Sequence, residues 1–230
     1  MTTWKIKYTT LTQCNLLFDA IRDKDLDKFK KEMVVQDVNY QTPEGWTALM
    51  ALSRIGRSNV EMEMIELLLQ GGADPNLQNS DGRTALHYAS RWSGNHSTER
   101  TVELLLQGGA EPNIQDSDGW TALHYASRLS RTESTERTVE LLLRGGAEPN
   151  LRNNNGETAL YYASWYSGTD STERTVELLL RGGANPNTDA STQKIYQTML
   201  IKKARSTIAA KLFMGFHLPL EFYQKLPMIV

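Results

Sequence analysis

Residues 82–118 read GRTALHYASRWSGNHSTERTVELLLQGGAEPNIQDSD, and this stretch decides the fold because the chain repeats it, with variations, in four units. The units begin 37 residues apart, at Gly45, Gly82, Gly119 and Gly156. A fixed period of this length is typical of stacked supersecondary units that each bury one face against a neighbour. Such a chain builds a long surface rather than a pocket, so binding is expected rather than catalysis.

The composition narrows the classes of function. The chain has 230 residues, with 25 basic and 27 acidic side chains and a formal net charge of −2. This balance argues against a protein that binds nucleic acid by neutralising phosphates. Neither a secretory signal nor an apolar run long enough to span a membrane is visible. Cys14 is the only cysteine, which leaves no internal disulfide or cysteine-based metal cluster and favours the cytoplasm.

Each unit predicts a helix, a loop, a second helix and a turn. In the unit that starts at Gly82, Thr84 stands where a helix N-cap is wanted, and Ala85–Ser90 are good helix formers. Ser97 and Thr98 offer a second N-cap after a polar stretch. Gly108-Gly109 ends the second helix, since glycine enters the left-handed conformation without steric cost.

The repeated unit resembles the ankyrin repeat. The family's Thr-Pro-Leu-His-x-Ala signature corresponds to Thr84–Ala89 and Thr121–Ala126, and more loosely to Thr158–Ala163 and Thr47–Leu52. The family's Leu-Leu-x-x-Gly-Ala-Asp-x-Asn ending corresponds to Leu68–Asn76 and to three close copies. The resemblance is good over residues 45–190 and loose at the flanks. It implies an all-α fold, an ankyrin-type helical solenoid with short hairpin turns between repeats.

The sequence departs from the family pattern in two ways. Alanine replaces the signature proline in every unit, which still permits a helix but fixes its first φ angle less. The period is 37 residues, whereas the family's is about 33. Alignment of both signatures places four extra residues between the two helices of each unit, which predicts a row of four enlarged loops along one edge. These loops are expected in the segments Arg54–Glu61, Arg91–Thr98, Arg128–Thr135 and Trp165–Thr172.

We expect a cap at each end of the repeats. Residues 1–40 are predicted to be a degenerate first repeat that caps the N-terminus, residues 41–190 to hold the four repeats, and residues 191–230 to form C-terminal capping helices. Leu218-Pro219-Leu220-Glu221 resembles the opening of F-box-like modules, which recruit ubiquitin-ligase components. The same four residues also fit an ordinary helix cap.

Candidate catalytic and metal-binding groups are scarce. His87 and His124 hold the same signature position, where the ankyrin histidine usually forms hydrogen bonds within and between repeats. Met50 and Tyr161 occupy this position in the other two units, which favours a structural role over a catalytic one. With one cysteine and no clustered ligands, the sequence predicts neither metal nor cofactor, and no enzyme.

A Ser-Thr-Glu-Arg tetrad recurs at Ser97–Arg100, Ser134–Arg137 and Ser171–Arg174. Its arginines either meet Glu99, Glu136 or Glu173 of the next unit in a ladder, or are solvated charges beside a helix cap. Because the tetrad does not vary, it is expected to serve the stack rather than the choice of partner.

Positions that vary between copied units are better candidates for partner binding. The residue after each turn glycine is Trp46, Arg83, Trp120 or Glu157. The ankyrin resemblance places this position on the concave binding side, and tryptophan is a frequent interface anchor. The alternative is that Trp46 and Trp120 lie flat over neighbouring hairpins.

A second set of candidates closes the first helix of each unit. The partner-binding residues predicted there are Arg54, Arg91, Arg128 and Trp165. The residues that follow them are apolar in all four units, so they are expected to pack beneath the loops; they are Ile55, Trp92, Leu129 and Tyr166.

The sequence therefore predicts a monomeric module that binds a partner protein through its hairpin tips and first helices. The alternative is a substrate adaptor that recruits a ubiquitin-ligase component through its C-terminal segment. Ankyrin arrays of near-identical units are abundant in large DNA viruses and intracellular bacteria, so the resemblance also suggests a role in a host cytoplasm.

Overall fold

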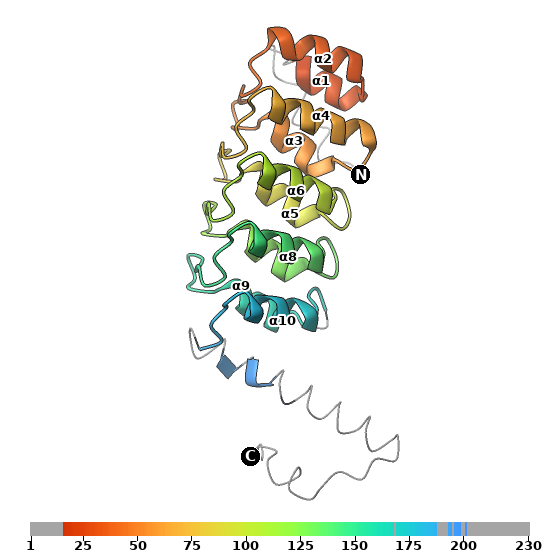
Figure 1. Cartoon of the computed structure of the whole chain (residues 1–230). Coiled ribbons are helices and arrows are strands. Elements are labelled where there is room, and N and C mark those ends of the chain that lie inside the picture. The colour runs from red at the N-terminus through yellow and green to blue at the C-terminus, as the bar shows by residue number, and fades with distance from the viewer. Residues whose placement is uncertain (1–15, 168, 188–192, 195, 199–200, 202–230) are drawn as a thin grey trace, which may run out of the picture.

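The computed structural model describes residues 16–167, 169–187, 193–194, 196–198 and 201. In this part of the chain, pairs of helices stack along one axis, which confirms the predicted all-α solenoid (Figure 1). The pairs are α1 (Leu16–Asp23) with α2 (Leu26–Val35), α3 (Ala48–Ile55) with α4 (Asn59–Gln70), α5 (Ala85–Trp92) with α6 (Glu99–Gln107), α7 (Ala122–Leu129) with α8 (Glu136–Arg144), and α9 (Ala159–Trp165) with α10 (Glu173–Arg181).

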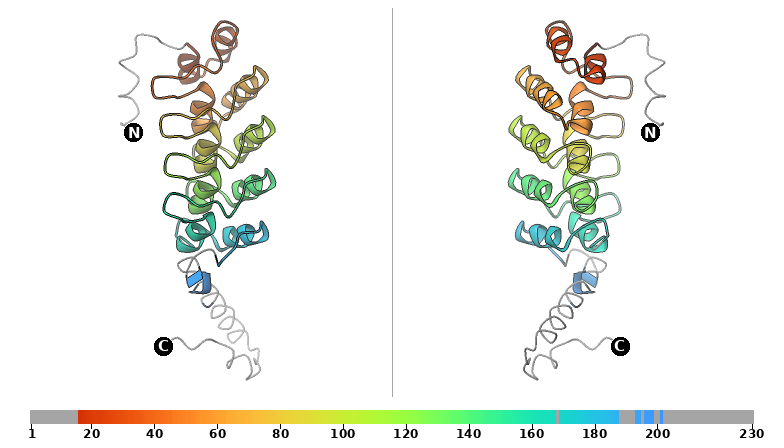
Figure 2. Two further views of the ribbon diagram at one scale, coloured as in Figure 1. Left: turned by 90° about the vertical axis from the view of Figure 1, so that its left-hand side faces the viewer. Right: turned by 90° about the vertical axis from the view of Figure 1, so that its right-hand side faces the viewer.

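The helices form two columns, which Figure 2 shows from either side. First helices contact first helices from α3 through α5 and α7 to α9, and second helices contact second helices from α4 through α6 and α8 to α10. Each unit buries the same leucines, none more than 1 % exposed: Leu49, Leu86, Leu123 and Leu160 from the first column, and Leu68, Leu105, Leu142 and Leu179 from the second. One hydrophobic core therefore runs the length of the stack.

Threonines begin the helices as predicted. Thr84 is the N-cap of α5 and Thr98 is the N-cap of α6, both in extended backbone conformation. The side-chain oxygen of Thr98 accepts a hydrogen bond from the backbone N–H of Thr101. The first helix thus still forms with alanine at the signature proline position.

Two kinds of glycine adopt the left-handed conformation. Gly109 has φ +89° just after α6, where a Cβ would meet no atom within 4 Å. Gly82, in the hairpin, has φ +74°, and a Cβ there would lie 2.8 Å from the backbone nitrogen of Ser117 in the next hairpin. The first glycine ends a helix, and the second also lets two hairpins approach closely.

The first helix pair packs on the stack in the same manner as the repeats. Leu17, Ala20 and Phe29 are fully buried. Asn39, after α2, donates to the carbonyl of Gly72 at 3.2 Å and accepts from the N–H of Asp74 at 2.7 Å. The same pair of bonds joins Asn76 to the following unit. The predicted capping helices of residues 191–230 and the segment Leu218–Glu221 lie outside the described residues, apart from a few positions before 202.

The prediction of four enlarged loops is wrong for the first unit. There, α4 has 12 residues, whereas α6, α8 and α10 have 9 each. Ser58 and Glu61 form a capping box, with Ser58 N–H donating to Glu61 Oε2 at 2.8 Å, and this box starts the helix early. Threonine replaces Glu61 in the other three units, so no box forms and the loop stays long.

Candidate binding surface

The hairpin turns and the loops between helices lie at opposite ends of each helix pair; we call them the hairpin edge and the loop edge (Figure 1). At the hairpin edge, Gln78 Nε2 donates to the carbonyl of Gly82 at 2.6 Å and to that of Gln115, one unit further, at 3.2 Å. His87 Nε2 donates to the carbonyl of Trp120 at 3.0 Å, and His124 Nε2 to that of Glu157 at 3.2 Å. These bonds join neighbouring units.

The two signature histidines are buried and neutral. His124 is 1 % exposed, and its Nδ1 accepts from the backbone N–H of Thr121. Burial lowers the pKa of His124 to about 4 and also lowers the pKa of His87. The expected structural role of both side chains is confirmed by these bonds.

The tryptophans after the turn glycines pack against rings of the next unit. The ring of Trp46 is 4.6 Å from that of Tyr88, and the ring of Trp120 is 4.3 Å from that of Tyr162. Trp120 also lies 4.9 Å from Tyr125. Both tryptophans are half-buried, because part of each ring packs against the neighbouring unit. Their contact with a partner protein stays a prediction.

Arg83 and Glu157, at the same position in the other units, have internal polar partners. Arg83 Nε lies 3.3 Å from Oδ2 of Asp116, whose side chain is fully buried. Tyr125 donates to that same oxygen at 2.7 Å, and Glu157 accepts from the hydroxyl of Tyr162. All four predicted hairpin residues therefore contact Tyr88, Tyr125 or Tyr162, or a hydrogen-bond partner of one of them. These tyrosines were not among the predicted site residues.

This tyrosine row consists of Tyr88, Tyr125 and Tyr162, one per unit. The hydroxyls bond to Asn79, Asp116 and Asn153, with Asn79 Nδ2 donating to Tyr88 at 2.9 Å. Burial first, and then the acidic acceptors, raise the pKa of Tyr125 and Tyr162 above the ordinary value. The signal in the sequence was the recurrence of tyrosine every 37 residues after the signature histidine position.

The predicted residues at the ends of the first helices are more available. Arg54 and Trp165 are exposed, with Trp165 60 % exposed and stacked on Tyr161 at 6.0 Å. Arg91 and Arg128 are half-buried. The Arg91 guanidinium lies 4.9 Å from the centre of the Trp92 ring, and that of Arg128 lies 4.9 Å from the centre of the Tyr166 ring.

The apolar residues that follow these positions differ in how far they are buried. Trp92 packs against the loop through His96, with ring centres 5.2 Å apart, and Leu129 and Tyr166 are half-buried. Ile55 is 40 % exposed, so the prediction that it packs beneath a loop is wrong. The physical reason is the short loop of the first unit, which does not cover it.

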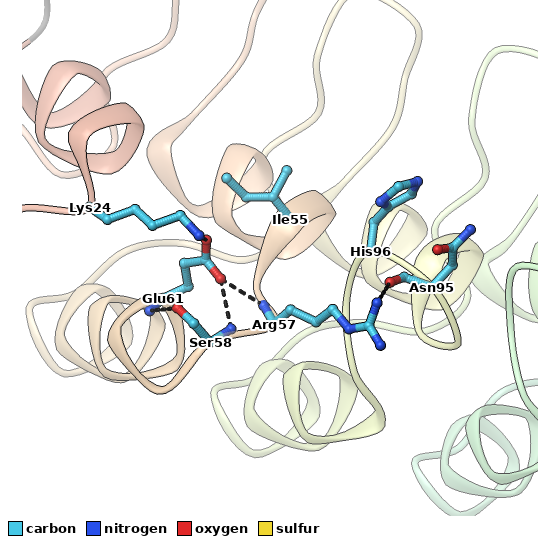
Figure 3. Close-up of a pocket in the computed structure, with 7 residues that line it drawn as sticks. All are labelled: Lys24, Ile55, Arg57, Ser58, Glu61, Asn95 and His96. Carbon is cyan, nitrogen blue, oxygen red and sulfur yellow. Dashed lines mark hydrogen bonds and ion pairs between the residues drawn. The ribbon is translucent and has the colours of Figure 1, made fainter. Parts of the chain in front are cut away.

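One shallow pocket of about 330 Å³ lies on the loop edge near the N-terminal end (Figure 3). Its centre is Glu61, which is bound by Lys24 Nζ at 2.8 Å and by the N–H groups of Arg57 and Ser58. Burial opposes ionisation of Glu61, but these hydrogen bonds outweigh it and lower the pKa of its carboxyl. Since the acid is already fully paired, the pocket has little left to offer a ligand.

A second pocket, of about 380 Å³, is centred on the third unit and is also lined by Arg91 of the second unit and Asp170 of the fourth. It combines two basic, two acidic and three uncharged side chains: Arg91, Arg128, Glu133, Asp170, Tyr125, Leu129 and Thr132. This pocket brings two of the predicted binding residues, Arg91 and Arg128, to one place.

The arginines of the first two Ser-Thr-Glu-Arg tetrads pair with acids of the previous unit, which matches neither the ladder through the tetrad glutamates nor a solvated charge. Arg100 lies 3.4 Å from Glu66 of the previous unit, and Arg137 lies 3.7 Å from Glu103 of the previous unit. The acidic partners are thus the glutamates within the second helices, because these lie beside the arginines, whereas the tetrad glutamates occupy the first helical position. Thr172 donates to Glu136 instead.

Neither a metal site nor a membrane span is found in the part of the chain that the structure describes. Within it, no group of three or more histidine, cysteine or acidic side chains is arranged to hold an ion. None of the helices described is both long and apolar enough to cross a bilayer.

Comparison with known proteins points to the same architecture. A family model described as "Ankyrin repeats (3 copies)" matches residues 17–99 and 93–190, well over half of the chain. No curated protein matches the sequence.

Proposed function

Because the chain belongs to the ankyrin-repeat family, we propose that it is a non-catalytic module that binds a partner protein along the ends of its first helices. Ankyrin repeats are generally protein-interaction modules and typically do not catalyse reactions. The proposed surface consists of Arg54, Arg91, Arg128 and Trp165, flanked at the hairpin edge by Trp46, Arg83, Trp120 and Glu157. We place the protein in the cytoplasm, as a monomer.

The observation that carries this proposal is the exposure of Trp165. Among the exposed large hydrophobic side chains of the described residues, Trp165 is the only aromatic one. It occupies the position that arginine holds in the three preceding units, so aromatic and basic groups share one column of the stack. Tryptophan and arginine are the residues most enriched among the dominant contacts of protein interfaces.

The test is capture of partner proteins from a cell lysate with the full chain as bait. Trp165→Ala is expected to lower recovery of the specific partner about tenfold or more. Trp165→Phe is the matched control, because it keeps an aromatic ring at the same place, and it should retain most of the recovery. The melting temperature should be nearly unchanged in both variants, because 60 % of Trp165 is exposed. Equal recovery by wild type and Trp165→Ala would remove this surface from consideration.

Trp120 is a poorer choice for that experiment. Its ring touches the rings of both Tyr125 and Tyr162, so alanine there is expected to weaken the stack as well as any contact with a partner. The adaptor alternative depends on Leu218–Glu221, which lies outside the described residues, and its proposed ligase partner follows from that sequence motif alone.

A further inference from the structure

The pocket centred on the third unit holds one arginine without an ion pair among the described residues. Arg91 lies 3.6 Å from Glu133 through its Nε. Arg128, by contrast, has no carboxylate oxygen within ion-pair distance among the residues that the structure describes. The Nε atoms of both arginines are buried and have no hydrogen-bond partner among these residues, so the two differ only in the ion pair that Arg91 has and Arg128 lacks. A charged side chain without a carboxylate partner is available to a ligand of opposite charge.

Aromatic rings hold the Arg128 guanidinium in place. Its central carbon lies 4.9 Å from the ring centre of Tyr166 and 5.8 Å from that of Trp120. Both rings are themselves packed, Trp120 against Tyr162 and Tyr166 parallel to Tyr162. The guanidinium is thus positioned before a ligand arrives, which lowers the entropy lost on binding.

We propose that this pocket binds the carboxylate of an acidic side chain in an extended segment of the partner protein, with Arg128 as its anchor. The inference rests on the proposed binding function and names the chemistry of the partner. A carboxylate matches the planar fork of arginine, which can donate two parallel hydrogen bonds to it. A phosphate dianion fits less well, because Glu133 and Asp170 also line the pocket and repel a second negative charge.

The position of Trp165 adds a second requirement to the same segment. Arg128 and Trp165 are equivalent residues of α7 and α9, one unit apart. Packed helices are about 8–10 Å apart, and an extended chain rises about 3.3 Å per residue. The acidic residue should therefore be followed or preceded, about three positions away, by a large apolar residue that covers the Trp165 ring.

Selection of random dodecapeptides displayed on phage, with the full chain as immobilised target, tests this arrangement. We expect enrichment of peptides that carry Asp or Glu about three positions from an aromatic or leucine residue. Selection on Arg128→Gln should lose the acidic preference. Selection on Arg144→Gln should keep it, since that exposed arginine on α8 pairs with Glu140 at the surface, away from the pocket lining, and its loss gives the same change in charge.

A second variant, Arg128→Lys, distinguishes loss of the guanidinium group from loss of the fold. Arg128→Lys keeps the positive charge and its ring contacts but lacks the fork, so a selected peptide should bind it about tenfold more weakly by fluorescence anisotropy. Circular dichroism and thermal melting of each variant establish that it is folded.

Acidic peptides that bind wild type, Arg128→Gln and Arg128→Lys equally would overturn the carboxylate site. Selection of only non-acidic peptides, or of none, would overturn it as well. In those cases the lysate capture with Trp165→Ala still decides the proposed function, because that experiment does not depend on Arg128 or on an extended segment.

Discussion

The hairpin edge and the loop edge join the same units with different chemistry. At the hairpin edge, side-chain amides and imidazoles bond to backbone carbonyls of the next unit, as Gln78 does to Gln115. At the loop edge, buried hydroxyls bond to one another: Ser130 Oγ lies 2.6 Å from Thr175 Oγ1 and 3.1 Å from Ser171 Oγ. Ser93 makes the same two contacts one unit earlier; we call these buried serines and threonines, with their equivalents Ser97 and Thr101, the hydroxyl row.

The loops also exchange backbone hydrogen bonds. Gly94 N–H donates to the carbonyl of Glu133 at 3.1 Å, and Arg131 N–H to that of Asp170 at 3.0 Å. From the sequence, the inserted residues were only a lengthening that the fold tolerates at low entropic cost. In the structure, the inserted residues instead form a second line of hydrogen bonds between units, at the opposite end of the helix pairs from the hairpins.

Removal of Ser130 is the strongest way to break the loop edge. Ser130→Ala leaves the buried hydroxyls of Ser171 and Thr175 without this partner, so we expect a loss of about 3 kcal/mol in unfolding free energy. Urea or guanidinium titration measures it. The matched control is Ser97→Ala in the same row, where the buried Oγ has no hydrogen-bond partner and removal should cost little. Equal losses in the two variants would show that the hydroxyl bonds do not matter.

Acid should weaken the hairpin edge selectively. Burial lowers the pKa of His124 to about 4 and also lowers that of His87, while in the unfolded chain a histidine binds its proton near pH 6.5. The stability that the neutral imidazoles contribute is therefore complete above that pH and is lost as the pH falls toward 4. Between about pH 6.5 and 5, His124 alone should remove about 1.5 kcal/mol, with His87 acting in the same direction.

Denaturant titration at several pH values checks the acid effect. Replacement of both histidines by methionine, the residue that Met50 provides at this position in the first unit, is the control. That variant should be less stable at neutral pH but nearly insensitive to pH in this window. If the unfolding free energy of this variant depended on pH as steeply as that of the wild type, the effect would belong to other titratable groups.

Ion pairs on the outer surface of the second helices should contribute least to the unfolding free energy. They give a reference for the larger contributions of the two edges. Arg137→Gln removes ion pairs with Glu103 at 3.7 Å and Glu140 at 2.8 Å, but about half of the arginine side chain is exposed. Exposed pairs contribute about 0–1 kcal/mol, so the loss should be below about 1 kcal/mol. It should shrink further in high salt, as thermal melting at two ionic strengths would record. A larger loss, unaffected by salt, would contradict a surface ion pair.

Much of the fold could be predicted because it depends on local signals repeated four times. Thr84 as an N-cap and Gly109 in the left-handed conformation follow from residues within one helical turn. The early start of α4 also depends on a local signal, because Ser58 and Glu61 form a capping box. The 37-residue period aligns this segment with the longer loops of the other units, so the period alone predicts a long loop here as well.

The candidate site was harder to predict because its contacts join residues more than 30 positions apart. Trp120 and Arg83 were recognised as variable positions, but nothing in the sequence tells which face of each side chain is covered by the next unit. The residues of the tyrosine row and of the hydroxyl row recur in the sequence at the repeat period. Their roles required the register between units, which sets Ser130 beside Thr175 and Trp46 beside Tyr88.

The short loop of the first unit has a consequence for the order of the units. At the hairpin edge, each acceptor is a backbone carbonyl, which is present whatever the residue. A hydroxyl row demands matching partners, and Gly56 stands where Ser93 and Ser130 stand in later units. Thr101 Oγ1 therefore meets no serine hydroxyl but the Gly56 carbonyl at 3.4 Å and Met62 Sδ at 3.5 Å, and Ser97 Oγ has no hydrogen-bond partner among the described residues. Units of the second and third kind can thus be duplicated or exchanged without loss of the hydroxyl row. The first unit joins its successor at the loop edge through Arg57, which donates to the carbonyl of Asn95, and it cannot take their place without breaking that row.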